Sequence, residues 1–139
     1  MSIGRFILSV GVVFIVYIVL YLITMGVIFA DIYTANVDMI RSPADGLAPY
    51  QMLGHLLQTT VVVLLFNIFV ASSDIRAGAR FGLLIGAYLA ATHLSVYTGL
   101  DVDISPLPYS IVIHLFVGAV VGLVLAKLYE PRELGAVEV

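Results

Sequence analysis

The stretch RFILSVGVVFIVYIVLYLITMGVIFA, residues 5–30, decides the fold class, because it contains no charged residue after Arg5. An α-helix crosses the hydrocarbon core of a bilayer with about 20 mostly apolar residues. The stretch is also much longer than the apolar region of a secretory signal peptide, which has about 7–15 residues. Because Ile28-Phe29-Ala30 makes a poor cleavage site, the stretch predicts a retained membrane-spanning helix over about residues 6–30.

Three further apolar segments follow, at about residues 50–72, 81–100 and 109–129. The chain of 139 residues is 62% hydrophobic and 11% charged, with a mean hydropathy of +1.14, which excludes an ordinary soluble domain. Short connections between the last three segments predict antiparallel neighbours. We therefore expect an all-α membrane protein with four antiparallel transmembrane helices, in one domain over residues 1–139 with a short cytoplasmic tail from about residue 131.

The connection over residues 31–49 is the only long one. Its first half is predicted to extend the first helix outward as far as Ile40. Ser42-Pro43 and Asp45-Gly46 are typical of turns, and Pro49 suits the first turn of the second helix.

Basic residues predict the orientation of the chain. Only Arg41 falls on one side of the predicted helices, and the positive-inside rule therefore places both termini in the cytoplasm. The net charge of −3 and the lack of a basic patch argue against nucleic-acid binding. The absence of cysteine excludes disulfides and thiolate metal sites. The basic residues on the opposite, cytoplasmic side are Arg5, Arg76, Arg80, Lys127 and Arg132.

Small residues recur at four-residue spacing in the third and fourth predicted helices. Because helices associate in lipid through close backbone packing, such ladders predict helix–helix contact surfaces. Whether the two ladders face each other or another subunit is left open by the sequence. The ladders are Gly78, Gly82, Gly86 and Ala90 in the third helix, and Gly118, Gly122 and Ala126 in the fourth.

Three histidines interrupt the apolar helices. His55 shares one face of the second helix with Gln51, Gln58 and Thr59, while His93 and His114 lie in line with the glycine ladders. Each histidine is about five or six residues from the same predicted boundary, which places all three roughly 7–10 Å deep at 1.5 Å per residue. We expect one polar layer in the outer half of the bundle. A stripe on the first helix, Tyr17, Tyr21, Thr24 and Asp31, adds Tyr21 and Asp31 to the candidate residues His55, His93, His114, Gln58 and Thr59.

This layer is open to several interpretations. Neutral imidazoles bind zinc, copper or haem iron, so His55, His93 and His114 are the candidate metal ligands if a metal is present. A cluster of His, Tyr and Asp can also relay protons, bind a quinone head group or line a transport site. Structural hydrogen bonding between helices, or a water pocket, explains the same residues, and no cofactor is predicted on this interpretation.

Two functions follow from these features. The chain is too small, and its loops too short, for soluble-enzyme chemistry, and no nucleophile–base pair, carboxylate dyad or phosphate loop is recognisable in the sequence. We expect a non-enzymatic accessory or structural subunit whose Gly/Ala faces contact a larger membrane complex or a second copy. The alternative is a ligand-binding or transport protein with a histidine-lined site for a metal, haem, quinone or small substrate.

The segments GVIFADIYTA, LGHLLQTTVVVLLFNIF, GARFGLLIGAYLA and FVGAVVGLVLAKLYEP resemble a group of small bacterial four-helix membrane proteins. That group is similar in length and is defined only as a domain of unknown function. The resemblance implies a multi-pass fold in the bacterial inner membrane and supplies no catalytic residues. Only His55 falls inside a segment that carries the resemblance to the group.

Overall fold

The computed structural model describes residues 2–35, 46–101 and 103–129, and every regular element in these ranges is a helix. Four spans are long and apolar enough to cross a membrane, which confirms the predicted fold class. The spans are Ile3–Ile28, Ala48–Val70, Ile75–Thr98 and Leu107–Leu128. The elements are α1 (Ile3–Ile23), the π-helix η1 (Thr24–Ile28), α2 (Ala30–Ala35), α3 (Ala48–Leu65), the π-helix η4 (Phe66–Val70), α4 (Ile75–Thr98) and α5 (Leu107–Leu128).

The bounds of the first span differ from those predicted. The helix begins at Ile3 because the Ser2 side chain accepts a hydrogen bond from the Arg5 amide. The chain bends at Phe29, with φ −116° and ψ 27°, so α2 is a separate short helix rather than an unbroken continuation. The rest of the predicted extension, residues 36–40, lies outside the described part of the chain.

The third span begins at Ile75 rather than near residue 81. The Asp74 carboxylate accepts hydrogen bonds from the amides of Arg76 and Ala77, at 3.0 and 3.3 Å, and so forms the N-cap of α4. Hydrophobicity alone missed this first turn because it carries Arg76 and precedes Arg80. The predicted position of Pro49 in the first turn of α3 is confirmed.

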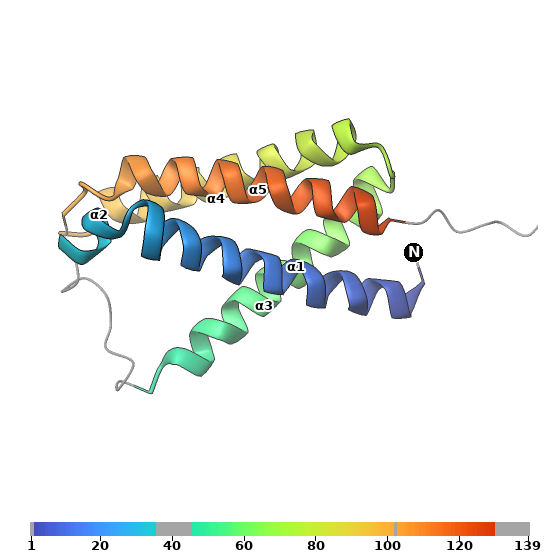
Figure 1. Ribbon diagram of the computed structural model, residues 1–139, viewed down its shortest axis with the longest axis horizontal. Coiled ribbons are helices and arrows are strands. Elements are labelled where there is room, and N and C mark those ends of the chain that lie inside the picture. Colours follow the sequence, from blue (N-terminus) through green and yellow to red (C-terminus); the bar gives the residue numbers. More distant parts are fainter. Residues whose placement is uncertain (1, 36–45, 102, 130–139) are drawn as a thin grey trace, which may run out of the picture.

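The four spans run alternately up and down, and α3 crosses the others at a steep angle (Figure 1). The beginning of α1 and the end of α5 lie at the same end of the bundle, where the Arg5 guanidinium is 3.5 Å from the Leu128 carbonyl oxygen. We call this the terminal end, and the opposite end, where α4 connects to α5, the connector end. The side of the membrane on which each end lies remains a prediction.

The two glycine ladders pack against each other. A Cβ atom added at Gly78, Gly82 or Gly86 would lie less than 3.0 Å from backbone atoms of α5, closer than real Cβ atoms come. The same holds for Gly118 and Gly122 against the backbone of α4. The small-residue faces are therefore covered within the chain by an α4–α5 contact in which the two backbones touch.

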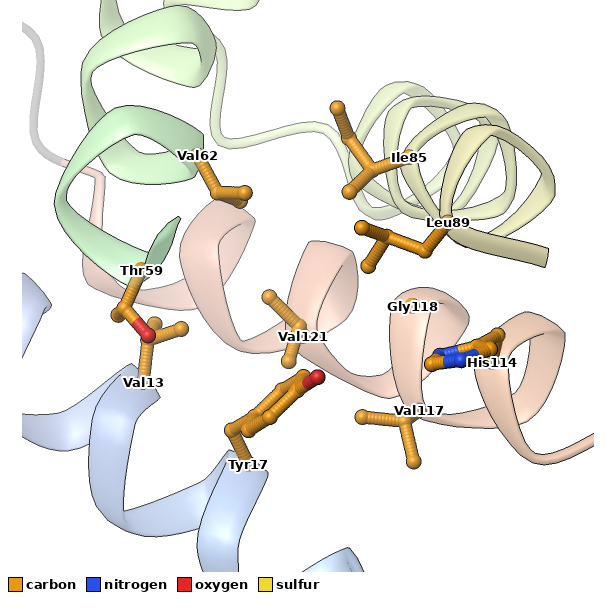
Figure 2. A pocket seen from close by; sticks show the side chains of 10 residues that line it. All are labelled: Val13, Tyr17, Thr59, Val62, Ile85, Leu89, His114, Val117, Gly118 and Val121. Carbon is orange, nitrogen blue, oxygen red and sulfur yellow. The ribbon is translucent and has the colours of Figure 1, made fainter. Parts of the chain in front are cut away.

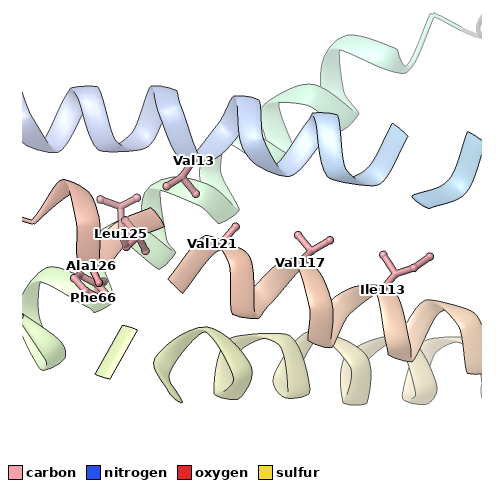
Figure 3. Packing of buried hydrophobic residues seen from close by; sticks show 8 residues of the cluster. Val13, Phe66, Ile113, Val117, Val121, Leu125 and Ala126 are labelled. Atoms are coloured by element: carbon pink, nitrogen blue, oxygen red, sulfur yellow. The ribbon is translucent and has the colours of Figure 1, made fainter. Parts of the chain in front are cut away.

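α5 is the most buried of the four spans, and its buried face carries most of the core. Val117, Val121 and Leu125 point from α5 toward α1, where they approach Val13 (Figure 3). Phe66 of η4 closes the terminal end of this core, with its ring edge-on to those of Phe81 and Tyr129. The complete cluster is Val13, Val63, Phe66, Ile113, Val117, Val121, Leu125 and Ala126.

In the turn at the connector end that leads into α5, Asp103 and Ser105 are joined by hydrogen bonds. The Asp103 carboxylate accepts hydrogen bonds from the Ser105 amide at 2.9 Å and the Ser105 hydroxyl at 2.6 Å. These bonds stabilise the charged form and lower the pKa of Asp103 below its ordinary value.

We expect Ser105→Ala to raise the pKa of Asp103 back toward the ordinary value, because the hydroxyl donor is lost. In the parent chain, the stability that the lowered pKa contributes is present above the unfolded pKa and is lost as pH falls through the folded pKa. A carboxyl ¹³C NMR titration measures the pKa of Asp103 in the parent chain and in Ser105→Ala. An unchanged Asp103 titration in Ser105→Ala would contradict this assignment.

Candidate functional site

A cleft of about 580 Å³ lies in the half of the bundle nearest the connector end. Its walls come from the second half of α1 and η1, the first half of α3, and one residue each of α4 and α5. Its volume is that of a small-molecule site, for which 300–1,000 Å³ is typical. The lining residues are Tyr17, Ile18, Tyr21, Leu22, Met25, Gly26, Gln51, Met52, His55, His93 and His114.

All three histidines line this one cleft, although they come from three different helices. His114 is buried, while His55 and His93 are half-buried. Together with Tyr21, they are the part of the predicted polar layer that the structure brings together. The arrangement depends on the α4–α5 glycine contact, because close backbones let His93 and His114 approach each other.

Each imidazole of the α4–α5 pair is held by a hydroxyl group at Nδ1. His114 Nδ1 is hydrogen-bonded to the Tyr21 hydroxyl of α1, which also lies 3.3 Å from His114 Nε2, and His93 Nδ1 lies 2.8 Å from the Ser110 Oγ atom of α5. The two imidazoles meet edge to face, with ring centroids 4.2 Å apart and planes at 86°. The ring positions are therefore fixed by partners on neighbouring helices.

Aromatic rings continue from this pair across the cleft to α3. The Tyr21 ring lies 5.6 Å from the His114 ring and 4.6 Å from the Tyr17 ring, measured between centroids. The Tyr17 ring in turn lies 5.6 Å from the His55 ring. Rings at these separations attract one another, so the series joins α5, α1 and α3 at one level of the bundle.

The other predicted site residues lie elsewhere. Thr59 is buried, and its hydroxyl donates to the His55 carbonyl oxygen at 2.8 Å, so it belongs to the interior of the bundle rather than to the cleft. Gln58 is half-buried and is not among the residues of the cleft wall. Asp31 is exposed on α2 and likewise does not line the cleft, because the bend at Phe29 redirects the chain beyond η1.

Three contributors, Gln51, Tyr17 and Ser110, were not among the predicted site residues. Gln51 lines the cleft together with His55, one helical turn away on α3. Tyr17 was assigned to the same stripe as Tyr21 without a role, and it stands at the centre of the ring series. Ser110 precedes His114 by one helical turn, and this i, i+4 spacing is the signal that places both on one face of α5.

A second, much smaller cavity of about 30 Å³ lies deeper, between all four spans (Figure 2). Tyr17 and His114 line both the cleft and this cavity, and therefore form the floor of the cleft. The other lining residues are apolar except for Thr59, so the cavity offers few hydrogen-bond partners to a water molecule. Beyond Tyr17 and His114 the bundle is mainly apolar toward the terminal end, and the buried polar side chains there are the hydroxyl groups of Thr59 and Ser9.

The three histidines are not placed together as a three-residue metal-binding group. Within the three described ranges, no set of three or more His, Cys, Asp or Glu side chains is placed to hold a metal ion. The edge contact between His93 and His114 also differs from a haem site, where two axial imidazoles must stand on opposite faces of a macrocycle. A metal or haem ligand for these histidines stays a prediction.

Fold and cleft together define a multi-pass membrane protein with four apolar helices in lipid and an aromatic, histidine-lined cleft between them. Compared with protein families, curated proteins and solved structures, the chain gives no match. The resemblance to the small bacterial membrane proteins therefore remains a prediction.

Proposed function

We propose that the chain is a membrane-embedded binding protein for a small, neutral, lipid-soluble molecule that carries a hydrogen-bonding group. The observation that carries the proposal is the cleft of about 580 Å³, in which a few polar side chains converge within apolar walls. This combination is typical of small-molecule sites.

The chemistry of the lining favours a neutral ligand. Among the described residues that line the cleft, none is Asp, Glu, Lys or Arg. An ionised group buried there would have no opposite charge to offset the loss of its hydration. The phenols and imidazoles supply hydrogen bonds, and the aliphatic side chains of α1 and α3 supply an apolar wall.

The rim of the cleft favours entry from the bilayer. Leu22 of α1 is 67% exposed and Met52 of α3 is 41% exposed, and both line the cleft. These two helices diverge toward the connector end, since α3 crosses α1 at a steep angle (Figure 1). A molecule dissolved among the lipid chains reaches the cleft sideways between them.

The same structure argues for binding rather than transport by a single chain. A transported polar molecule needs polar groups along its whole path. Beyond Tyr17 and His114, the buried polar side chains are the hydroxyl groups of Thr59 and Ser9, and in the described part of the chain the small, mainly apolar cavity and the core cluster offer no continuous polar path.

The expected role as an accessory subunit stays a prediction. It rested on the Gly/Ala faces as contact surfaces for another protein, and those of α4 and α5 are covered by each other. A partner would have to contact a different part of the chain.

Filling the cleft tests the proposal. Gly26 lines the cleft and has no atom within 4 Å of the position of an added Cβ, so Gly26→Leu places a side chain in open space. We expect this variant to fold and to lose affinity at least about tenfold, because the new side chain occupies ligand volume. Binding of 4-decylphenol is measured as its excess in protein-loaded lipid nanodiscs over empty ones.

Gly11→Leu is the matched control. Gly11 lies on α1, in the same membrane span as Gly26 of η1, and also has no neighbour within 4 Å, but it does not line the cleft. It should bind 4-decylphenol like the parent chain. The proposal is wrong if the parent chain shows no excess binding, or if Gly26→Leu and Gly11→Leu bind equally.

A further inference from the structure

We infer that the cleft takes the head group of a quinone and of its reduced quinol, a planar ring with oxygens at opposite edges. This inference rests on the proposed binding function and names its ligand class. It is carried by the way in which His93 and His114 are held, and by the aromatic walls around them.

The hydrogen bond to Ser110 leaves one ring nitrogen of His93 for a ligand. Ser110 occupies Nδ1 of His93, so Nε2 is the nitrogen of His93 that remains for a second partner, and His93 is one of the residues that line the cleft. A neutral imidazole has one donor and one acceptor nitrogen, and the partner at one nitrogen decides the role of the other. Ser110 therefore sets whether His93 donates or accepts in the cleft.

The donor or acceptor role of His93 can be reversed, because it depends on the direction of the hydrogen bond with Ser110. A serine hydroxyl both donates and accepts. When Ser110 donates to Nδ1, Nε2 carries the proton and donates to a carbonyl oxygen; when Ser110 accepts from Nδ1–H, Nε2 accepts from a hydroxyl group. The Tyr21 hydroxyl can likewise donate to or accept from the His114 ring, and both ring nitrogens of His114 are within its reach. Such a pair suits a ligand whose oxygens exist in both carbonyl and hydroxyl form.

The walls of the cleft suit a flat ring with oxygens at opposite edges. Tyr17 and Tyr21 present aromatic rings along one wall, which favours a flat ligand ring. Across the cleft from the α4–α5 pair, His55 and Gln51 of α3 provide polar groups for a second oxygen. A long apolar tail on the ring would leave the cleft between Leu22 and Met52.

The experiment compares a decyl-substituted 1,4-benzoquinone and its quinol with 4-decylphenol, which has only one oxygen. Full-length protein in nanodiscs should bind both the quinone and the quinol about tenfold more tightly than the phenol, the effect of one additional hydrogen bond. His93→Phe keeps a ring but removes both nitrogens, and should reduce this preference to within about twofold while phenol binding is unchanged.

Tyr97→Phe is the control, because Tyr97 stacks on His93 at 5.9 Å between centroids but does not line the cleft. It should keep the full preference for quinone and quinol. If His93→Phe does not fold, Ser110→Ala replaces it: the preference should fall and should return in Ser110→Thr, which restores a hydroxyl group.

The possible outcomes separate the two proposals. Equal binding of quinone, quinol and phenol overturns the quinone assignment and leaves the binding function standing. A preference that survives both His93→Phe and Ser110→Ala also overturns the assignment. If no probe exceeds its level in empty nanodiscs, the binding function itself fails.

Discussion

Gly82→Ala should destabilise the protein by about 3 kcal/mol, the upper part of the range for overpacked contacts. The added Cβ would lie within 3.0 Å of the Gly118 backbone, and neither backbone can yield without separating α4 from α5. Because His93 and His114 meet across this contact, the cleft should be lost with it. Unfolding in mixed micelles of rising SDS content, followed by circular dichroism, measures the change in stability.

Gly54→Ala provides the comparison for this effect. Gly54 lies within α3 and has no atom within 4 Å of an added Cβ. Alanine is favoured over glycine in a helix by about 1 kcal/mol, so this control should be as stable as the parent chain or more stable. Equal SDS midpoints for Gly82→Ala and Gly54→Ala would show that the two backbones do not touch.

Phe66→Ala is the second substitution with a large expected effect, a loss of about 3–5 kcal/mol. Phe66 is 1% exposed, and its ring contacts Phe81 of α4 and Tyr129 at the end of α5. Removing the ring leaves a cavity where η4 packs against the bundle. The α3 span crosses the other helices steeply and is held at this end. We expect faster proteolysis in the 71–74 connection and a lower SDS midpoint of unfolding.

Phe69→Ala separates this packing effect from a general loss of an aromatic residue. Phe69 lies in the same π-helix but is 76% exposed, so its ring faces away from the bundle. Its removal should change the SDS midpoint little. A similar destabilisation by both variants would mean that η4 does not anchor its span through Phe66.

The four helices and their close-packing faces could be predicted because both depend on local patterns. Length and hydrophobicity define a span, and glycine at every fourth position defines a face, as Gly78, Gly82 and Gly86 do. Which face meets which helix depends on tertiary packing, and the sequence left open whether the ladders met each other. Their contact in the structure reduces the support for a partner docked on them.

The candidate site was accessible to sequence reasoning only in part. Depth and helical phase placed His55, His93 and His114 at one level, and all three line one cleft. The steep crossing of α3 was not predictable from its own periodicity, and it determines that the cleft has an open side. Asp31 was expected beside Tyr21 because an unbroken helix was assumed, and the bend at Phe29 removes it from that stripe.

The open side between α1 and α3 also decides how occupancy should be described. A ligand that enters there equilibrates with the lipid phase, so the relevant concentration is its mole fraction among lipids, not its molarity in water. Partitioning already removes most of the ligand from water, and the cleft has only to compete with the surrounding acyl chains. Occupancy should therefore depend on the ratio of ligand to lipid and remain nearly constant when the whole membrane suspension is diluted with buffer.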